Sequence, residues 1–337
     1  LLINGLTSYQ KLTGETTYEA LLLSQVESLA AEIDASPYGM LDDYPGQYYS
    51  VDMIPAITAV WRADAVLGTD HSDFVARALR AFSGARLDPL TGLPTYTADS
   101  KRGVGYGPAR GVGMASSLIW ASELWPETAE GWFDSFENHF WQENGFAVGF
   151  RELSRELPAQ QWLLDVDAGP VVAGYGTAAT AFGIGTTRVY GRFDQAYPLT
   201  AQALAVSWPL PDGTRLGPRL LSNLSDAPFV GETVLLFVLT HQPGPEVLVT
   251  PKGRVPLVVY FIVGLYLVVG VFIVGWGITA VRRCRLDGGY EVGSAELQFV
   301  GWGILGGVGL LLIGTSHSLP GLLLLFVAQF LPAKKLA

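Results

Sequence analysis

The chain of 337 residues is 49% hydrophobic, carries a formal net charge of −10 and contains a single cysteine. These features exclude an intramolecular disulfide, a two-cysteine zinc site and a cysteine–cysteine redox pair. The acidic balance argues against a nucleic-acid partner, because acidic surfaces repel phosphates. Because the chain begins at Leu1 rather than methionine, we expect it to be a fragment or a processed product.

Charge and hydropathy divide the chain in two. Acidic residues dominate residues 1–250, whereas residues 251–337 are very apolar and carry more basic than acidic side chains. We therefore predict a globular domain over 1–250 and a transmembrane region over 251–337. We expect no metal and no cofactor. The histidines lack ligand spacing, and the glycine-rich segment 102–113 lacks the GK[ST] end of a phosphate-binding loop.

Helical periodicity runs through residues 1–250, with almost no strand alternation, so the sequence predicts an all-α domain. The predicted helices are 16–35, 52–67, 72–87, 109–124, 127–142, 167–190, 193–206 and 227–241. Tight turns alternate with long loops, and the long loops are 36–51, 88–108, 143–166 and 207–226.

The helices that follow the long loops repeat with a period of about 58 residues, which is typical of stacked helical hairpins. Long loops gathered at one end favour an α/α toroid, and an open α-solenoid is the alternative. Four hairpins are visible in the sequence. Since closed rings commonly use six, two further hairpins could precede Leu1.

Three of these helix starts share an aspartate followed closely by a proline, namely Asp52, Asp167 and Asp226. An aspartate at this position caps the exposed amides of a helix, and proline is tolerated in the first turn. In a toroid the same helix starts meet at the mouth of the central cavity. The sequence therefore leaves two interpretations open, a helix cap and an active-site carboxylate.

Asp165 and Asp167 stand two residues apart, so in an extended segment they point the same way. Two carboxylates that share a site cannot both ionise freely, and their pKa values separate into those of an acid and a base. We predict Asp52 and Asp167 as the catalytic pair, with Asp165 tuning Asp167. The alternative pairs Asp165 with Arg151 or Arg155.

The long loops also carry aromatic and charged side chains that suit a glycan-like, alcohol or isoprenoid-like ligand. We predict that Tyr49 and Glu152 contact the substrate and that Arg110 or Arg151 holds an anionic or hydroxyl group. The full set of predicted substrate-binding residues is Tyr49, Tyr106, Arg110, Arg151, Glu152 and Trp162.

Residues 255–281 contain no charge and are long enough to cross a bilayer as a helix. The shorter apolar segments 297–313 and 319–331 predict two further spans or one re-entrant hairpin. Basic residues after the first and last segments place the C-terminus in the cytoplasm and residues 1–250 outside it. We thus expect a plasma or inner-membrane protein with a lipid membrane as one partner.

Four segments of the chain resemble the linalool dehydratase/isomerase-like group of α/α-toroid proteins. They are YYSVDMIPAITAV (48–60), LDPLTGLPTY (87–96), ARGVGMASSLIW (109–120) and DVDAGPVVAGYGTAATAFGIGTTRVYGRFDQA (165–196). The resemblance implies a six-hairpin toroid with a deep central pocket. Enzymes of that family add water to an alkenol or remove it, with the participation of cysteines, whereas residues 1–250 of this chain contain none.

The functional hypothesis is an envelope enzyme that uses carboxylates for acid/base catalysis. It would act as a hydrolase or as a lyase of the dehydratase type on a glycan-like or alcohol substrate. The alternative is a non-catalytic ligand-binding or scaffold protein of the cell envelope that uses the same cavity. The sequence does not indicate an oligomeric state.

Overall fold

A computed structural model describes residues 1–158, 162–208, 215–224 and 226–286, together with 301, 303–309, 312, 321 and 323–325; in the last long helix it describes side chains through Val268 and at three later positions. The chain forms two compact units. The first unit comprises Leu1–Leu199 and Thr240–Arg254, and the second comprises Thr200–Leu239 and Val255–Ala337. The domain boundary at residue 250 stays a prediction.

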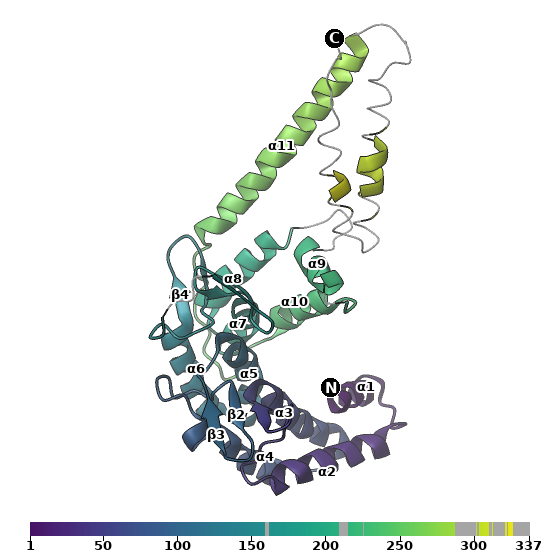
Figure 1. The fold of residues 1–337 in the computed structure, drawn as a ribbon. Helices are drawn as coiled ribbons and strands as arrows, with labels where there is room; N and C mark the ends of the chain where they lie inside the picture. The colour runs from purple at the N-terminus through teal and green to yellow at the C-terminus, as the bar shows by residue number, and fades with distance from the viewer. Residues whose placement is uncertain are drawn as a thin grey trace. The chain divides into compact units, whose positions relative to one another are not determined.

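Helices form most of the first unit (Figure 1). They are α1 (Leu2–Thr13), α2 (Glu19–Ala35), α3 (Ser50–Leu67), α4 (Ser72–Ala78), α5 (Gly111–Leu124), α6 (Pro126–Phe140), α7 (Thr177–Val189) and α8 (Phe193–Val206), whose last residues belong to the second unit. Short 3₁₀ turns follow α4 at Leu79–Phe82 and Gly84–Arg86. Helix α5 packs against α3, α6 and α7, and α3 packs in turn against α1 and α2.

Glycines allow the close packing around α5 and α7. A Cβ atom on Gly111 would lie 2.0 Å from the carbonyl oxygen of Arg151, and one on Gly183 would lie 2.4 Å from the ring of Phe150. No side chain fits into gaps of this size. The small residues of the segment 165–196 therefore serve helix packing within the first unit.

Three small antiparallel sheets correct the prediction of an all-α fold. They are β1 (Gln47–Tyr49), β2 (Thr97–Asp99) and β3 (Val104–Tyr106), then β4 (Trp141–Glu143) with β5 (Val148–Phe150), and β6 (Trp162–Asp165) with β7 (Gly169–Val172) and β8 (Tyr175–Gly176). Most of these strands lie in the segments predicted as long loops. At two to four residues each, they are too short to show an alternating pattern in the sequence.

The largest correction falls on the helix predicted over 167–190. Residues before Thr177 form β7 and β8 instead, and only the remainder is helical. Gly169 and Gly174 adopt φ angles of 65° and 84°, which lie in the left-handed region and are incompatible with a continuous right-handed helix. The delayed start of α7 also breaks the regular repeat on which the toroid prediction rests. Asp226, predicted as the cap directly before a helix over 227–241, has a φ of 49° and is separated by three residues from α10, which starts at Val230.

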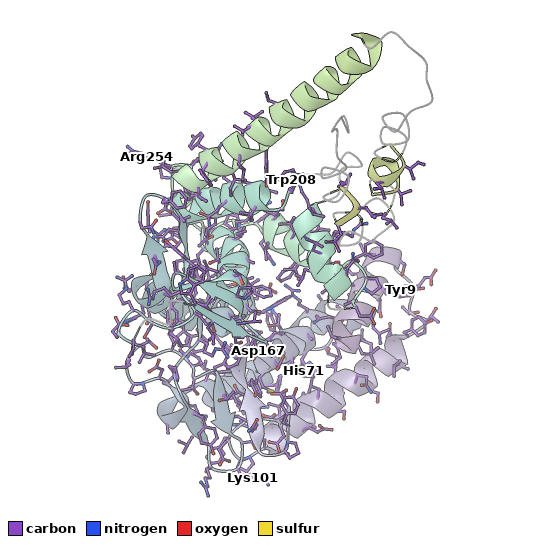
Figure 2. All side chains as sticks on the ribbon, turned by 45° about the horizontal axis from the view of Figure 1, so that its top comes forward. Tyr9, His71, Lys101, Asp167, Trp208 and Arg254 are labelled. Atoms are coloured by element: carbon purple, nitrogen blue, oxygen red, sulfur yellow. The ribbon has the colours of Figure 1, made fainter. Side chains whose placement is uncertain are left out.

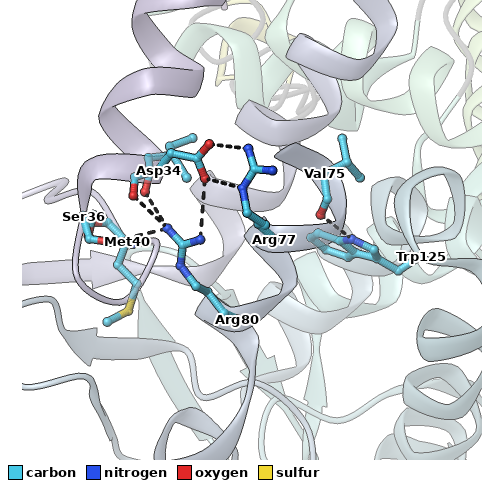
Figure 3. Close-up of polar contacts among 8 residues, drawn as sticks. Asp34, Ser36, Met40, Val75, Arg77, Arg80 and Trp125 are labelled. Atoms are coloured by element: carbon cyan, nitrogen blue, oxygen red, sulfur yellow. Dashed lines mark hydrogen bonds and ion pairs between the residues drawn. The ribbon is translucent and has the colours of Figure 1, made fainter. Parts of the chain in front are cut away.

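Two arginines fasten the end of α2 to the segment around α4 (Figure 3). Arg77 Nη2 donates to Asp34 Oδ2 over 2.6 Å, and Arg80 Nη2 donates to the backbone carbonyl of Asp34 over 3.1 Å. Trp125 Nε1 donates to the carbonyl of Val75 over 2.9 Å, which ties the junction of α5 and α6 to the same segment. These bonds connect α2, α4 and the junction of α5 and α6.

The second unit contains α9 (Leu216–Leu224), α10 (Val230–Thr240) and α11 (Leu257–Leu286). Arg219 Nε donates to Glu232 Oε1 over 2.8 Å, and Ser222 Oγ donates to Glu232 Oε2 over 2.6 Å. These two bonds join α9 to α10. Neither α1 nor α9 is predicted by the helical periodicity, whereas α3, α5, α6 and α8 are confirmed to within a few residues.

A helix needs about 20 consecutive apolar residues to cross the hydrocarbon core of a bilayer. Within the part of the chain that the structure describes, no helix combines the length and the apolar character that this requires. This finding overturns the predictions of transmembrane helices, of a membrane localisation and of the orientation derived from them. The shorter segments predicted at 297–313 and 319–331 lie largely outside the described residues.

Candidate carboxylate site

A β-hairpin presents the two aspartates that the sequence singles out. Strands β6 and β7 pair in antiparallel register with Asp165 opposite Gly169, so residues 166–168 form the turn between them. Asp165 Oδ1 accepts hydrogen bonds from the backbone amides of Asp167 and Ala168, each over 2.9 Å. Asp167, labelled in Figure 2, therefore lies in a hairpin turn and does not cap a helix.

Arg110 is the centre of the cluster and lies directly before α5. Its Nε donates to Glu152 Oε1 over 2.6 Å, its Nη2 lies 2.9 Å from Asp165 Oδ1, and its Nη1 lies 3.9 Å from Asp167 Oδ2. The guanidinium also stacks on the ring of Tyr96, 4.7 Å from the ring centre. Asp165 therefore pairs with Arg110 and not with either of the arginines expected from the sequence.

Glu152 holds Arg110 through an ion pair. Its side chain is only 4% exposed, and Oε2 accepts the backbone N–H of Val112 over 3.2 Å. Burial raises the pKa of Glu152 to about 7, against the opposing influence of Arg110 and of the Val112 N–H. A carboxyl group so enclosed holds Arg110 in place, and its contact with a substrate stays a prediction.

Asp52 lies in the first turn of α3, and Tyr49, not Asp52, occupies the N-cap position of that helix. Its side chain faces solvent, yet its pKa is raised, first by partial desolvation and then by the negative charge of Asp167. Of the two carboxylates that the sequence pairs, Asp167 is therefore close enough to raise the pKa of Asp52.

Two tyrosines flank the pair. The hydroxyl of Tyr96 hydrogen-bonds to Asp167, and burial together with that negative charge raises the pKa of Tyr96. The ring of Tyr49 meets Tyr96 edge to face with 5.5 Å between ring centres. Asp43 Oδ2 accepts the backbone N–H of Tyr49 over 2.7 Å, and burial raises the pKa of Asp43.

Three of the predicted substrate-binding residues do not join the cluster through their side chains. Arg151 Nη1 donates to Gln142 Oε1 over 2.5 Å, and its Nε donates to the carbonyl of Leu153. Tyr106 donates to Asp99 Oδ2 over 2.9 Å across the β2–β3 hairpin. Trp162 is 75% exposed at the start of β6.

Sequence reasoning did not assign Tyr96 to the site. Tyr96 occurs in a loop that is rich in aromatic and charged residues, which is the signal that could have found it. The pairing of Tyr96 with Asp167 joins residues far apart in the chain, so no local pattern indicates it. The cluster as described thus contains Asp52, Tyr96, Arg110, Glu152, Asp165 and Asp167, and we call it the carboxylate cluster.

The carboxylate cluster holds four acidic side chains around one arginine, so its electrostatic potential is negative when most of the carboxyl groups are ionised. Arg110 directs its Nε at Glu152 and its Nη2 at Asp165. An anionic ligand would therefore meet repulsion there. Among the described residues, no group of three or more histidine, cysteine, aspartate or glutamate side chains has the arrangement of a metal site.

No protein-family model matches the chain, and a comparison with curated proteins finds no match. The functional argument therefore depends on the geometry and charge of the carboxylate cluster.

Proposed function

We propose that the chain is an enzyme that uses Asp52 and Asp167 as a general acid and a general base on a neutral, hydroxylated substrate. The observation that carries the proposal is the raised pKa of Asp52 beside the charge of Asp167. Two neighbouring carboxyl groups with separated pKa values are the usual means of running acid and base chemistry together.

Each residue has a defined part in this proposal. Asp52, whose pKa is raised above its ordinary value, protonates the oxygen of the leaving group. Asp167, oriented by the Tyr96 hydroxyl, removes a proton from water, or from the carbon adjacent to the one that bears the departing oxygen, so that a double bond forms as the C–O bond breaks. Arg110 and Asp165 fix the hairpin turn that carries Asp167.

If Asp167 removes the proton from water, the enzyme is a hydrolase that acts on a glycosidic bond. If it removes the proton from carbon, the enzyme is a lyase that dehydrates an alcohol. The resemblance to dehydratase/isomerase-like proteins supports the second reaction. The negative charge of the cluster supports a neutral substrate for both, because a phosphate or carboxylate group would be repelled. We therefore assign Arg110 to positioning and not to anion binding.

The test is a turnover screen with the full chain against neutral oligosaccharides and small unsaturated or tertiary alcohols. On any substrate found, Asp52→Asn and Asp167→Asn should each lower kcat at least about 100-fold, the usual share of one acid or base. Asp73→Asn, which removes an exposed carboxylate on α4, is the matched control and should leave kcat unchanged.

Unchanged turnover in both cluster variants would remove the pair from the reaction. Binding of a neutral ligand without turnover, weakened by Asp52→Asn, would instead support the non-catalytic alternative.

A further inference from the structure

A second site lies apart from the carboxylate cluster, in a pocket of about 760 Å³ between α1, α3, the turn after α3 and the end of α5. None of the residues of the carboxylate cluster lines it. Its volume falls within the range of about 300–1,000 Å³ that is common for small-ligand sites. We propose that this pocket binds a neutral mono- or disaccharide, a function independent of the acid/base chemistry proposed above.

Three charged residues of the pocket wall have hydrogen-bond partners within the protein. Arg62 Nε donates to Glu123 Oε2 over 2.8 Å, and Asp64 Oδ1 lies 2.5 Å from His71 Nδ1 and accepts a bond from Thr69 over 2.6 Å. His71 is among the side chains labelled in Figure 2. Arg62 and Glu123 therefore offset each other's charge, and Asp64 is held by hydrogen bonds.

The two remaining charged residues of the wall, Lys11 and Asp70, have opposite signs. The charges of the whole lining therefore nearly balance. A neutral ligand with many hydroxyl groups fits this wall better than an ion of either sign, because it gains hydrogen bonds without bringing an uncompensated charge.

Trp61 supplies the apolar part of the site. Its side chain lines the pocket and is 38% exposed, so part of the indole is available to a ligand. The C–H face of a pyranose ring packs against such a surface and removes apolar area from water. Asn4 and Ser8 of α1 add donors and acceptors on the same wall.

The experiment applies the full chain to an array of neutral and acidic glycans, and then measures the affinity of the best neutral mono- or disaccharide by calorimetry. We expect Trp61→Ala to weaken binding about tenfold, since it removes the packing surface. The matched control is Trp162→Ala, which removes another exposed tryptophan outside the pocket and should leave the affinity unchanged.

If Trp61→Ala does not fold, Ala65→Trp serves instead, because it fills the pocket from an exposed position on α3 and should abolish binding.

Three results would overturn the proposal: no neutral glycan binds, only acidic glycans bind, or the best neutral ligand binds equally well to Trp61→Ala or Ala65→Trp. Asp52→Asn separates this site from the carboxylate cluster. Loss of saccharide binding in that variant, with binding retained in Ala65→Trp, would place the ligand in the cluster and remove it from this pocket.

Discussion

Replacing Glu152 by glutamine isolates what its buried carboxyl group does to the stability of the fold. The pKa of Glu152 is raised by burial from its ordinary 4.5 to about 7. Between these two pH values the folded protein binds more protons than the unfolded chain, so the free energy of unfolding falls as the pH rises. Above pH 7 the carboxyl group is ionised in both states, and its effect levels off.

The size of this effect follows from the pKa difference. At about 1.4 kcal/mol for each pKa unit, ionisation of Glu152 lowers the free energy of unfolding by about 3 kcal/mol between pH 4.5 and pH 7. Glutamine does not titrate, so Glu152→Gln removes this dependence. Glutamine also has a single acceptor oxygen for the two donors, Arg110 Nε and Val112 N–H, which adds a pH-independent cost of about 1–3 kcal/mol.

The assay is urea unfolding of the wild type and of Glu152→Gln, followed by circular dichroism from pH 4.5 to pH 8. We expect the variant to be less stable at pH 4.5 and to gain about 3 kcal/mol relative to the wild type by pH 8. Glu130→Gln, which changes an exposed glutamate on α6, should run parallel to the wild type. A Glu152→Gln curve that also runs parallel would refute the reasoning.

Two further substitutions test the packing and the charge of the first unit. Gly111→Ala should lower the free energy of unfolding by more than about 2 kcal/mol, because the new Cβ atom would clash with the carbonyl of Arg151. Gly131→Ala, which has open space around it in α6, should raise the free energy of unfolding by up to about 1 kcal/mol. Equal effects in urea unfolding would contradict the close packing of α5. Arg110→Met should lower the free energy of unfolding by about 3–5 kcal/mol at pH 8, because Glu152 would then be an unpaired buried charge. At pH 5, where Glu152 is protonated, the loss should be smaller. A loss of stability that does not depend on pH would contradict the pairing of Arg110 with Glu152.

Helices were predictable from the sequence where the periodic signal is long and its ends are marked. Helix α3 is one example, because it ends at Gly68 in the left-handed conformation, and α6 is another, because Pro126 occupies its first turn. The strands were not predictable, since two to four residues carry too little alternation. The segment 167–176 follows the helical pattern in composition, but the backbone at its glycines forms a hairpin instead.

The carboxylates of the candidate site were chosen from the sequence, and the structure brings Asp52, Glu152, Asp165 and Asp167 together. Their partners were not predictable in the same way. Arg110 joins Asp165 across a long stretch of chain, and the spacing of residues in one sequence does not reveal such a pair. The direction of a side chain also cannot be read from the sequence. Arg151, for example, was predicted to bind the substrate, but its guanidinium points toward Gln142 and away from the cluster.

The ionisation of Asp52 tests the central claim most directly. Carboxyl carbon NMR of the wild type and of Asp167→Asn, with Asp52→Asn to assign the signal, measures its pKa in both proteins. The account predicts a pKa for Asp52 above its ordinary 3.8 that falls when the charge of Asp167 is removed. A pKa of about 3.8 that is unchanged in Asp167→Asn would contradict the proposed acid/base pair.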